Sequence, residues 1–500
     1  MTETVTTDAD QATSAETFQT LNPATGEVLA TLPVESAQQI AGKLADARAA
    51  QQWWAQIGFG ARKERLLKWR TAISARIEEI AEVIHREGGK PLDDARLEVI
   101  LAVEHIDWAA KNARKVLGRR NVSPGMLLAN YAASVSHVPY GVVGVIGPWN
   151  YPVFTPMGSI AYALAAGNTV LFKPSEYTPL VGKWLVESIS EVVPEHPVLQ
   201  LVTGLGQTGA DLCTSGVDKI AFTGSTGTGK KVMAACAQNL TPVLMECGGK
   251  DVLIVDEDAD VPAAVDAAVF GGFSNAGQTC IGTERVYAHE KVYDDVVARL
   301  AETARSLVPG DDTGASYGPM TMPSQLDIVR RHVDDALDRG ARAVVGGRDS
   351  VGERYVAPVV LADVPEDSLA VTEETFGPTI TVGKFATVDE AIKKANATRY
   401  GLGAAVFSKS RGELIAERLR TGMVSINSVV SFAGMASLPF GGVGDSGFGR
   451  IHGADGLREF ARAQSIARLR VPIPLNVTSL ARRPGMLKML GKAVAKRFGA

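Results

Sequence analysis

Cysteine is scarce in this chain, which has four in 500 residues. They are Cys213, Cys236, Cys247 and Cys280, with no Cys-x-x-Cys pair and no histidine at the spacing of a metal ligand. This distribution argues against a disulfide framework and against a structural zinc site. We therefore predict that the protein has no metal site and works in a reduced, cytoplasmic setting.

An excess of one charge and long apolar runs are also missing. Lys and Arg number 51 and Asp and Glu 55, a formal net charge of −4, so we expect no nucleic-acid partner. The best candidate for a membrane span, Ser159 to Phe172, is broken by Gly167 and Asn168 and is shorter than the ~18 apolar residues required. The first seventeen residues are small and polar with several acids, so we predict that residues 1–17 are a disordered tail rather than an export signal.

The sequence does contain short β-branched runs that alternate with helical stretches. The runs are Val142 to Ile146, Thr169 to Phe172, Leu199 to Val202, Lys219 to Phe222 and Val252 to Val255. Helical patterns such as Pro179 to Val192 and Gly227 to Gln238 separate them, and a longer amphipathic helix is predicted from Ala61 to Glu87. Strands that alternate with helices predict an α/β fold with a Rossmann-like, doubly wound parallel sheet.

A second alternating region begins after Gly248 and Gly249. It contains a predicted helix from Pro262 to Phe273 and predicted strands near Arg285 to Ala288, Ala404 to Phe407 and Met423 to Ile426. We place a domain boundary near residue 248, with return crossings late in the chain. In the first region glycines mark the strand ends, which is where ligands bind in open parallel sheets.

Cys280 and Glu246 are candidates for catalysis. Cys280 closes the segment Gly277-Gln278-Thr279-Cys280 after an apolar helix, where a thiol can face a crevice. The alternative is a buried packing cysteine, the usual state of an unactivated thiol. Glu246 stands between an apolar strand and two glycines, where burial raises a carboxyl pKa and suits the group to act as a general base. A helix cap or an ion pair is the alternative for Glu246.

Polar residues also follow two of the predicted strands. Asn150 lies between Pro148 and Pro152, where a rigidly held amide can stabilise an oxyanion, although the same residues also form ordinary turns. Lys173 and Glu176 follow the next strand, and an acid at that place accepts hydrogen bonds from ribose hydroxyls in dinucleotide folds.

A glycine-rich loop offers a different interpretation. The segment Gly224-Ser225-Thr226-Gly227-Thr228-Gly229-Lys230 matches the phosphate-binding loop of nucleoside triphosphatases as far as its lysine. The next residue is Lys231 instead of the Ser or Thr that would hold magnesium, and Asp256 is the nearest strand-terminal aspartate. The sequence therefore disfavours a nucleoside triphosphatase, a hypothesis that ATP binding in the presence of magnesium would test.

Seven motifs, taken in order, resemble the signature series of the aldehyde dehydrogenase superfamily. They are Pro148-Trp149-Asn150-Tyr151-Pro152, Lys173-Pro174-Ser175-Glu176, Phe222-Thr223-Gly224-Ser225-Thr226, Glu246-Cys247-Gly248-Gly249-Lys250, Gly277-Gln278-Thr279-Cys280, Glu374-Thr375-Phe376-Gly377-Pro378 and Pro439-Phe440-Gly441-Gly442. The resemblance runs from about residue 18 to about residue 470. It implies the NAD(P)-dependent oxidation of an aldehyde to a carboxylic acid.

The resemblance also implies roles for individual residues. Cys280 is the expected nucleophile, which forms a thiohemiacetal and then a thioester, while the Asn150 amide and the Cys280 backbone N–H stabilise the oxyanion. Glu246 is the expected base that activates water to release the acid. The expected cofactor is NAD, with NADP as the alternative. The expected cofactor-binding residues are Trp149, Lys173, Glu176, Gly206, Gly224, Ser225, Gly229, Glu374 and Phe376.

A three-part subunit follows from the same resemblance. Residues 18–247 are expected to form a dinucleotide-binding domain, with an oligomerisation hairpin at about 119–139. Residues 248–440 are expected to form a catalytic domain, and residues 441–472 a return segment with an oligomerisation strand. A homodimer or homotetramer is therefore expected.

This chain departs from the family pattern at two positions. Many relatives have a leucine where this chain has Cys247, which we interpret as a small apolar filler beside the base. Many also carry a glutamate where this chain has Ile451, so a second acid in the proton path is not expected here. The following His452-Gly453 resembles the branch that acts on medium-chain, long-chain and aromatic aldehydes.

The expected substrate is an aliphatic or aromatic aldehyde, and two alternatives remain. A succinate semialdehyde dehydrogenase would need a cation for the distal carboxylate, and Arg285, five residues after Cys280, is the nearest basic residue in the sequence. A catalytically silent relative that acts as a binding or structural protein is the second alternative, and intact Cys280, Glu246 and Asn150 argue against it. Because relatives that transfer the acyl group to coenzyme A typically lack the base, Glu246 favours water as the acceptor.

Residues 473–500 extend beyond the family's usual final strand and form a basic tail without an acid. Read as a helix, they place apolar and basic residues on separate faces. The apolar positions are Leu487, Leu490, Val494 and Phe498, and the basic positions are Lys488, Lys492 and Lys496. This pattern is typical of an interfacial helix that makes peripheral contact with an anionic membrane. The alternative is packing on a neighbouring subunit, and Gly491 weakens an isolated helix by ~1 kcal/mol.

Overall fold

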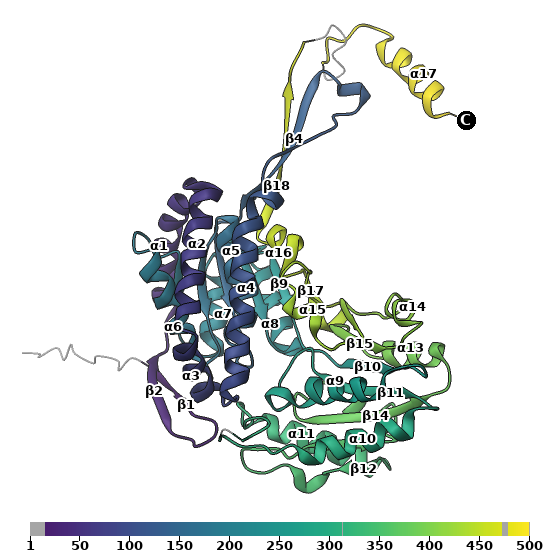
Figure 1. Ribbon diagram of the computed structural model, residues 1–500. Coiled ribbons are helices and arrows are strands. Elements are labelled where there is room, and N and C mark those ends of the chain that lie inside the picture. Colours follow the sequence, from purple (N-terminus) through teal and green to yellow (C-terminus); the bar gives the residue numbers. More distant parts are fainter. Residues whose placement is uncertain (1–15, 313, 473–478, 500) are drawn as a thin grey trace, which may run out of the picture.

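The computed structural model describes residues 16–312, 314–472 and 479–499, which form two large mixed sheets and two smaller ones. Figure 1 shows two α/β bodies and a slender extension that projects from the first of them. The structure confirms the α/β class. The predicted tail of residues 1–17 lies outside the described residues except for Glu16 and Thr17, and Thr17 already begins a strand because it pairs with Pro33.

The first large sheet has six strands in the order β17-β9-β8-β5-β6-β7. These are β17 (Gly447–Phe448), β9 (Val243–Glu246), β8 (Lys219–Thr223), β5 (Val142–Ile146), β6 (Thr169–Lys173) and β7 (Leu199–Leu201). All neighbours are parallel except β17, which runs antiparallel to β9. The predicted strands between residues 142 and 223 therefore belong to one doubly wound sheet.

Helices cover both faces of this sheet. They are α1 (Ala37–Gln56), α2 (Gly58–Ala75), α3 (Ile77–Gly88), α4 (Leu92–Leu117), α5 (Phe154–Ala166), α6 (Pro179–Val192), α7 (Gly206–Thr214), α8 (Thr226–Ala237) and α16 (Gly453–Glu459). Successive side chains along each strand point to opposite faces of the sheet, so the core is divided into two layers. Val142 and Ile220 pack with residues of α1, α7 and α8, whereas Val143 and Ala221 pack with residues of α2 to α6.

The single helix predicted from Ala61 to Glu87 is wrong, because α2 and α3 are separate. The backbone leaves the helical region at Arg76, with φ −122° and ψ 28°. Both helices nevertheless pack on α4 and α6, so their apolar faces remain in phase. The apolar residues therefore keep their helical spacing across Arg76, so the sequence pattern gives no sign that the helix is broken there.

The second large sheet has seven strands in the order β12-β13-β14-β11-β10-β15-β16. These are β12 (Arg342–Val345), β13 (Val359–Ala362), β14 (Thr379–Phe385), β11 (Thr283–His289), β10 (Asp251–Val255), β15 (Gly403–Phe407) and β16 (Met423–Ile426). All pairs are parallel except β12 with β13. The chain thus crosses from one sheet to the other between Glu246 and Asp251, and the predicted boundary near residue 248 falls in this crossing.

Seven helices and three short 3₁₀ turns in the described chain accompany this sheet. They are α9 (Val261–Phe273), α10 (Tyr293–Ser306), α11 (Gln325–Asp338), α12 (Leu369–Thr372), α13 (Val388–Asn396), α14 (Gly412–Ala416), α15 (Ser431–Gly434), η2 (Ser274–Gly277), η3 (Arg348–Ser350) and η4 (Gly444–Ser446). Of these, α9 and η2 lead directly to Cys280, so they position the candidate nucleophile.

The extension contains a three-stranded antiparallel sheet in the order β18-β4-β3. Its strands are β3 (Arg120–Val122), β4 (Tyr131–Pro139) and β18 (Ala461–Leu469), with the turn η1 (Met126–Leu128) between β3 and β4. A helix, α17 (Met486–Phe498), lies at its far end (Figure 1). We call β3, η1, β4, β18 and α17 the arm. The remaining sheet is the hairpin of β1 (Thr17–Leu21) and β2 (Val28–Pro33).

The described part of the C-terminal tail contains a helix, as the spacing of its apolar residues predicts. Helix α17 includes the four apolar and three basic positions that the pattern places on separate faces, whereas residues 473–478 and 500 lie outside the described residues. In the described chain, no helix combines the length and the apolar character that a bilayer crossing requires.

Candidate active site

The turn before Cys280 has an unusual backbone. Asn275, Ala276 and Gly277 all have positive φ, at 50°, 56° and 70°. Two consecutive non-glycine residues in the left-handed region cost free energy, so surrounding contacts must hold them there. Gln278 supplies several of these contacts, since its side chain donates to Asn275 O and Pro319 O and accepts from Thr321 N.

Asn150 is tied directly to this turn. Its Nδ2 donates to Gln278 O at 2.9 Å, and its carbonyl oxygen accepts from Asn275 Nδ2 at 3.1 Å. Asn150 is buried and follows β5, so two elements far apart in sequence meet at the nucleophile. The amide nitrogen carries a second hydrogen, which this bond does not use.

Two cavities meet at Cys280. An apolar cavity of about 250 Å³ lies toward α4 and α9, and a strand-end cavity of about 730 Å³ lies along the carboxyl ends of β5, β6 and β8. Their linings share Thr155, Thr223, Cys247 and Cys280. Cys280 therefore lines both cavities. A residue that reacts with one ligand while a second ligand is bound needs such a position.

Glu246 ends β9, where its backbone is held between β8 and β17. Its carboxylate lines the apolar cavity, and among the described residues none donates a hydrogen bond to it. Burial raises its pKa well above the usual value, against the opposing charge of Arg450. Gly441 passes so close that a Cβ there would stand 2.8 Å from the carboxylate, which explains the glycine at this position.

The surroundings of the Cys280 thiol favour its neutral form. Burial raises its pKa far above the usual range, and the neighbouring carboxylates Asp251, Glu374 and Glu246 raise it further. A neutral thiol must lose its proton as it attacks, so this site requires a nearby proton acceptor.

The strand-end cavity gathers most of the predicted cofactor residues. Those that line it are Trp149, Lys173, Glu176, Gly206, Gly224, Ser225, Glu374 and Phe376, and the predicted catalytic residue Asn150 lines it as well. Ser225 caps α8, where its side chain accepts from Thr228 N, and a Cβ at Gly206 would meet no atom within 4 Å. The cavity volume lies in the range of ligand pockets, and its glycine turns and helix N-termini suit a dinucleotide with its phosphates.

Gly229 does not line this cavity, contrary to the prediction. It lies inside α8, where a Cβ would stand 3.0 Å from Cys247 Sγ. Its glycine therefore permits close packing of α8 on the segment after β9. Burial raises the pKa of the Cys247 thiol to about 12, and the thiol packs in the core beside Met245, which agrees with a filler role.

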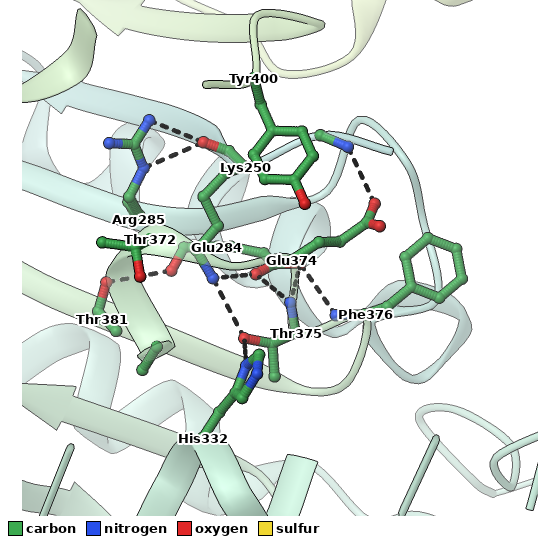
Figure 2. A network of polar contacts seen from close by, with 12 residues as sticks. Lys250, Glu284, Arg285, His332, Thr372, Glu374, Thr375, Phe376, Thr381 and Tyr400 are labelled. Carbon is green, nitrogen blue, oxygen red and sulfur yellow. Dashed lines mark hydrogen bonds and ion pairs between the residues drawn. The ribbon is translucent and has the colours of Figure 1, made fainter. Parts of the chain in front are cut away.

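A buried polar network positions Glu374 and Phe376 (Figure 2). Lys250 forms an ion pair with Glu284, and the Glu284 carboxylate accepts from the backbone N–H groups of Thr375 and Phe376. Phe376 has φ 52°, so this anchoring holds a left-handed residue in place. The Phe376 ring then meets Trp149 edge to face, with centroids 5.5 Å apart.

Glu374 is held from the other side, where its Oε1 accepts from Gly249 N at 2.9 Å. Burial and the charge of Glu284 raise its pKa to about 8. Sequence reasoning did not single out Lys250 or Glu284 as positioning residues. Lys250 stands inside a quoted motif, but Glu284 has no local signal because its partners lie 34 and 91 residues away.

The lining of the apolar cavity decides what can reach the thiol. Most of its side chains are aliphatic or aromatic, and the described residues that line it include no Lys or Arg. The large apolar members are Leu97, Leu101, Phe154, Phe270, Ile281, Leu402, Val429, Val430, Phe440 and Ile451. Carboxylates are present instead, since Asp94 and Glu98 belong to the lining together with Glu246.

Arg285, the cation considered for a substrate carboxylate, does not lie at this cavity. Its buried guanidinium donates to the backbone carbonyls of Lys250, Lys394 and Ala395. It therefore ties β11 to the segment before β10 and to α13, a structural role that its proximity to Cys280 in the sequence does not suggest.

A dinucleotide-sized cavity that meets a cysteine and a buried carboxylate on a two-sheet α/β scaffold defines an oxidoreductase. The model of the aldehyde dehydrogenase family matches residues 10–466. The chain belongs to this family and is an NAD(P)-dependent aldehyde dehydrogenase.

Individual relatives agree with this assignment. The chain is 36% identical over 485 residues to a Mycolicibacterium smegmatis protein named for succinate-semialdehyde dehydrogenase activity with NADP(+), covering 95% of this chain and 93% of the other. It is 36% identical to a 4,4'-diapolycopene aldehyde oxidase of Methylomonas sp, covering 89% and 84%. The NAD+ complex of a Bacillus cereus aldehyde dehydrogenase superposes with a TM-score of 0.86 at 32% identity, covering 90% and 93%.

Proposed function

We propose that this enzyme oxidises apolar aldehydes, aliphatic or aromatic, to carboxylic acids. The observation that carries the proposal is the apolar cavity beside Cys280, which has no cationic side chain among its described lining residues. Apolar walls favour a substrate that leaves water for hydrocarbon surroundings. The name of the Methylomonas relative, 4,4'-diapolycopene aldehyde oxidase, supports an aldehyde other than succinate semialdehyde.

In the first step, the Cys280 thiol gives its proton to a water molecule and Sγ attacks the aldehyde carbon. A carbon–sulfur bond forms, the π bond of the carbonyl breaks, and the carbonyl oxygen gains negative charge. The second Asn150 amide hydrogen and the Cys280 backbone N–H stabilise that oxygen. The strained turn and Gln278 hold both donors in fixed positions, so they do not reorganise during the attack.

When bound, the dinucleotide would accept the hydrogen and its electron pair from the substrate carbon. Trp149, Glu374, Phe376, Lys173 and Glu176 line the strand-end cavity and would hold and orient it there. Apolar side chains around Cys280 limit the access of bulk water to the thiol.

The resulting thioester on Cys280 is then hydrolysed. Glu246 accepts a proton from a water molecule, whose oxygen attacks the acyl carbon, and the thiolate leaves and recovers a proton. A buried carboxylate with a raised pKa is the appropriate base for this step near neutral pH.

A second candidate is the oxidation of succinate semialdehyde, which the name of the Mycolicibacterium relative favours. Its distal carboxylate would enter a cavity that presents Asp94 and no described cation. Leaving a buried charge unpaired costs about 3–5 kcal/mol, so we expect this substrate to be disfavoured.

The experiment is a kcat/KM panel of hexanal, benzaldehyde, betaine aldehyde and succinate semialdehyde, followed by NADH or NADPH absorbance. We expect hexanal and benzaldehyde to exceed succinate semialdehyde by at least ~100-fold. A preference for succinate semialdehyde would overturn the proposed substrate class. Cys280→Ala should bind cofactor without turnover, whereas Cys236→Ala, a buried thiol that lines neither cavity, should remain active.

A further inference from the structure

The arm differs in charge from the rest of the chain. Residues 119–139 and 460–500 together contain eleven Lys and Arg and no Asp or Glu, although the whole chain has more acids than bases. The bodies that hold the two cavities are therefore acidic on balance, and the arm is strongly basic. Such segregation creates a local positive field that attracts an anionic surface.

The far end of the arm also exposes large apolar side chains. On α17, Leu487 is 50% exposed and Phe498 is 74% exposed, and on η1 Met126 is 55% exposed. Val494 and Leu127 are exposed as well. A contiguous set of exposed apolar groups on a soluble surface indicates a binding site.

Helix α17 arranges these groups in an ordered way. Leu487, Leu490, Val494 and Phe498 follow one another at steps of three and four, so they form one stripe. Lys488, Lys492 and Lys496 lie on the other side of the helix and are exposed. Lysines beside an apolar stripe can extend to the polar headgroups while the stripe enters the acyl region.

The two apolar segments lie at the same end of the arm. Arg497 Nη1 donates to Met126 Sδ at 2.7 Å, a side-chain contact between the end of α17 and η1. Because this contact joins η1 to α17, we call residues 126–128 and 486–498 together the arm tip.

We propose that the arm tip is a docking surface for an anionic lipid bilayer. The apolar stripe of α17 and the η1 side chains enter the headgroup boundary, and the lysines contact the anionic headgroups. This inference goes beyond the aldehyde-oxidising function and does not depend on the substrate.

A second copy of the chain fits the arm tip less well. The match to the aldehyde dehydrogenase family ends at residue 466, whereas α17 begins at Met486, so α17 is not part of what the family shares. Contact between two arm tips is also disfavoured, because both lack acids and repel each other. Packing of the tip on the acidic body of a second copy is the outcome that the oligomeric mass measured below distinguishes. A polyanion such as RNA would satisfy the charges but would leave the apolar stripe in water.

The test is co-sedimentation of the full-length protein with vesicles of phosphatidylserine and phosphatidylcholine, in the absence of aldehyde. We expect sedimentation with these vesicles, little with pure phosphatidylcholine, and loss in about 0.5 M KCl, where charges are screened. Absence of sedimentation with the anionic vesicles would overturn the proposal.

Two variants separate the charge from the apolar stripe. Lys488→Glu/Lys492→Glu/Lys496→Glu should lower the partition into anionic vesicles by at least ~100-fold. Leu487→Ser/Val494→Ser/Phe498→Ser should also abolish sedimentation, although it leaves the charge unchanged. Sedimentation that survives the serine substitutions would overturn the bilayer in favour of a purely electrostatic polyanion site.

The matched control is Lys63→Glu/Lys68→Glu/Lys393→Glu, which makes the same change in net charge at exposed positions on α2 and α13. It should sediment as the unaltered protein does. Equal loss in the control and in the arm variant would refute a specific arm tip. A lower oligomeric mass of the arm variants with unchanged vesicle binding would identify a second copy as the occupant and overturn the proposal.

Discussion

At the scale of single residues, the environment of Glu246 is unusual. Among the described residues, none donates a hydrogen bond to its carboxylate, and burial raises its pKa. The charged form of Glu246 is therefore the less stable one, which makes it a strong proton acceptor once it is ionised. The catalytic rate should rise with pH as this carboxyl group loses its proton.

Glu246→Gln should stall the reaction after the oxidation step. We expect a pre-steady-state burst of NADH followed by slow turnover, because the amide cannot accept a proton from water. Stopped-flow absorbance measures both phases, and the pH-dependent limb that belongs to Glu246 should disappear. If the burst is lost as well, Glu246 must instead take the proton of the Cys280 thiol.

Glu176 should determine the preference between cofactors. It lines the strand-end cavity after β6, where a carboxylate accepts from ribose hydroxyls and repels a 2′-phosphate. We expect a higher kcat/KM with NAD than with NADP, and Glu176→Ser should narrow the difference. A higher value for the unaltered enzyme with NADP, the cofactor in the name of the Mycolicibacterium relative, would contradict this assignment.

Local sequence was sufficient for some site residues and insufficient for others. Glu246 and Asn150 stand at strand ends, so their position in a parallel sheet already predicts that they face a crevice. Arg285 misleads, because five residues of separation from Cys280 place it on β11, where its side chain donates to the carbonyls of Lys250, just before β10, and of Ala395 in α13. Glu284 shows the general limit, since its partners come from distant segments.

At the scale of secondary structure, the strand positions are well predicted and the helix ends less so. The strands β5 and β16 agree with their apolar runs. Side chains on both faces of β5 are buried, whereas in β16 the buried side chains alternate with more exposed ones. The break between α2 and α3 could not be predicted, because contacts with α4 and α6 keep both helices in phase. Tertiary packing, rather than local propensity, fixes that boundary.

Helix α6 depends on a distant carboxylate for its start. Glu87, at the end of α3, accepts from the backbone N–H groups of Leu180 and Val181 and from Thr20 Oγ1. Its side chain is buried, and burial raises its pKa to about 7 in spite of these donors. The Glu87 carboxyl group, which can gain or lose a proton, therefore connects α3 to the β1–β2 hairpin and to α6.

This raised pKa predicts a pH-dependent stability. The folded state binds the Glu87 proton more tightly than the unfolded chain, so its stabilising contribution is complete below about pH 4.5 and is lost as the pH rises to about 7. Relative to Glu87→Gln, the wild-type protein should lose roughly 3 kcal/mol of stability across this window. Parallel thermal melting at several pH values measures the difference, and a slope of opposite sign would show that the three donors outweigh burial.

At the scale of the whole molecule, the arm leaves the edge of β18 unpaired within the described chain, since β18 stands last in its sheet. An exposed strand edge is a template for pairing with another chain. We expect β18 to contribute to a homodimer or homotetramer, as the family resemblance implies. The sequence predicts the arm strands by resemblance, whereas their projection away from the body is visible only in the structure.

Ile466→Pro tests this use of the arm. Proline has no N–H, so it either breaks a bond of β18 to β4 or blocks the free edge. We expect a lower oligomeric mass by sedimentation velocity, with Ile466→Ala as a control that retains the mass. An unchanged mass in the proline variant would place the subunit contact elsewhere.

The meeting of two cavities at Cys280 has a consequence for steady-state kinetics. Because the walls of the two spaces share four residues and otherwise differ, one ligand does not have to leave before the other can enter. Initial-rate plots against aldehyde at several cofactor concentrations should therefore intersect rather than run parallel. A dead-end dinucleotide analogue should compete with the cofactor and not with the aldehyde. We therefore expect a ternary complex in which the two ligands lie on opposite sides of Thr155, Thr223, Cys247 and Cys280.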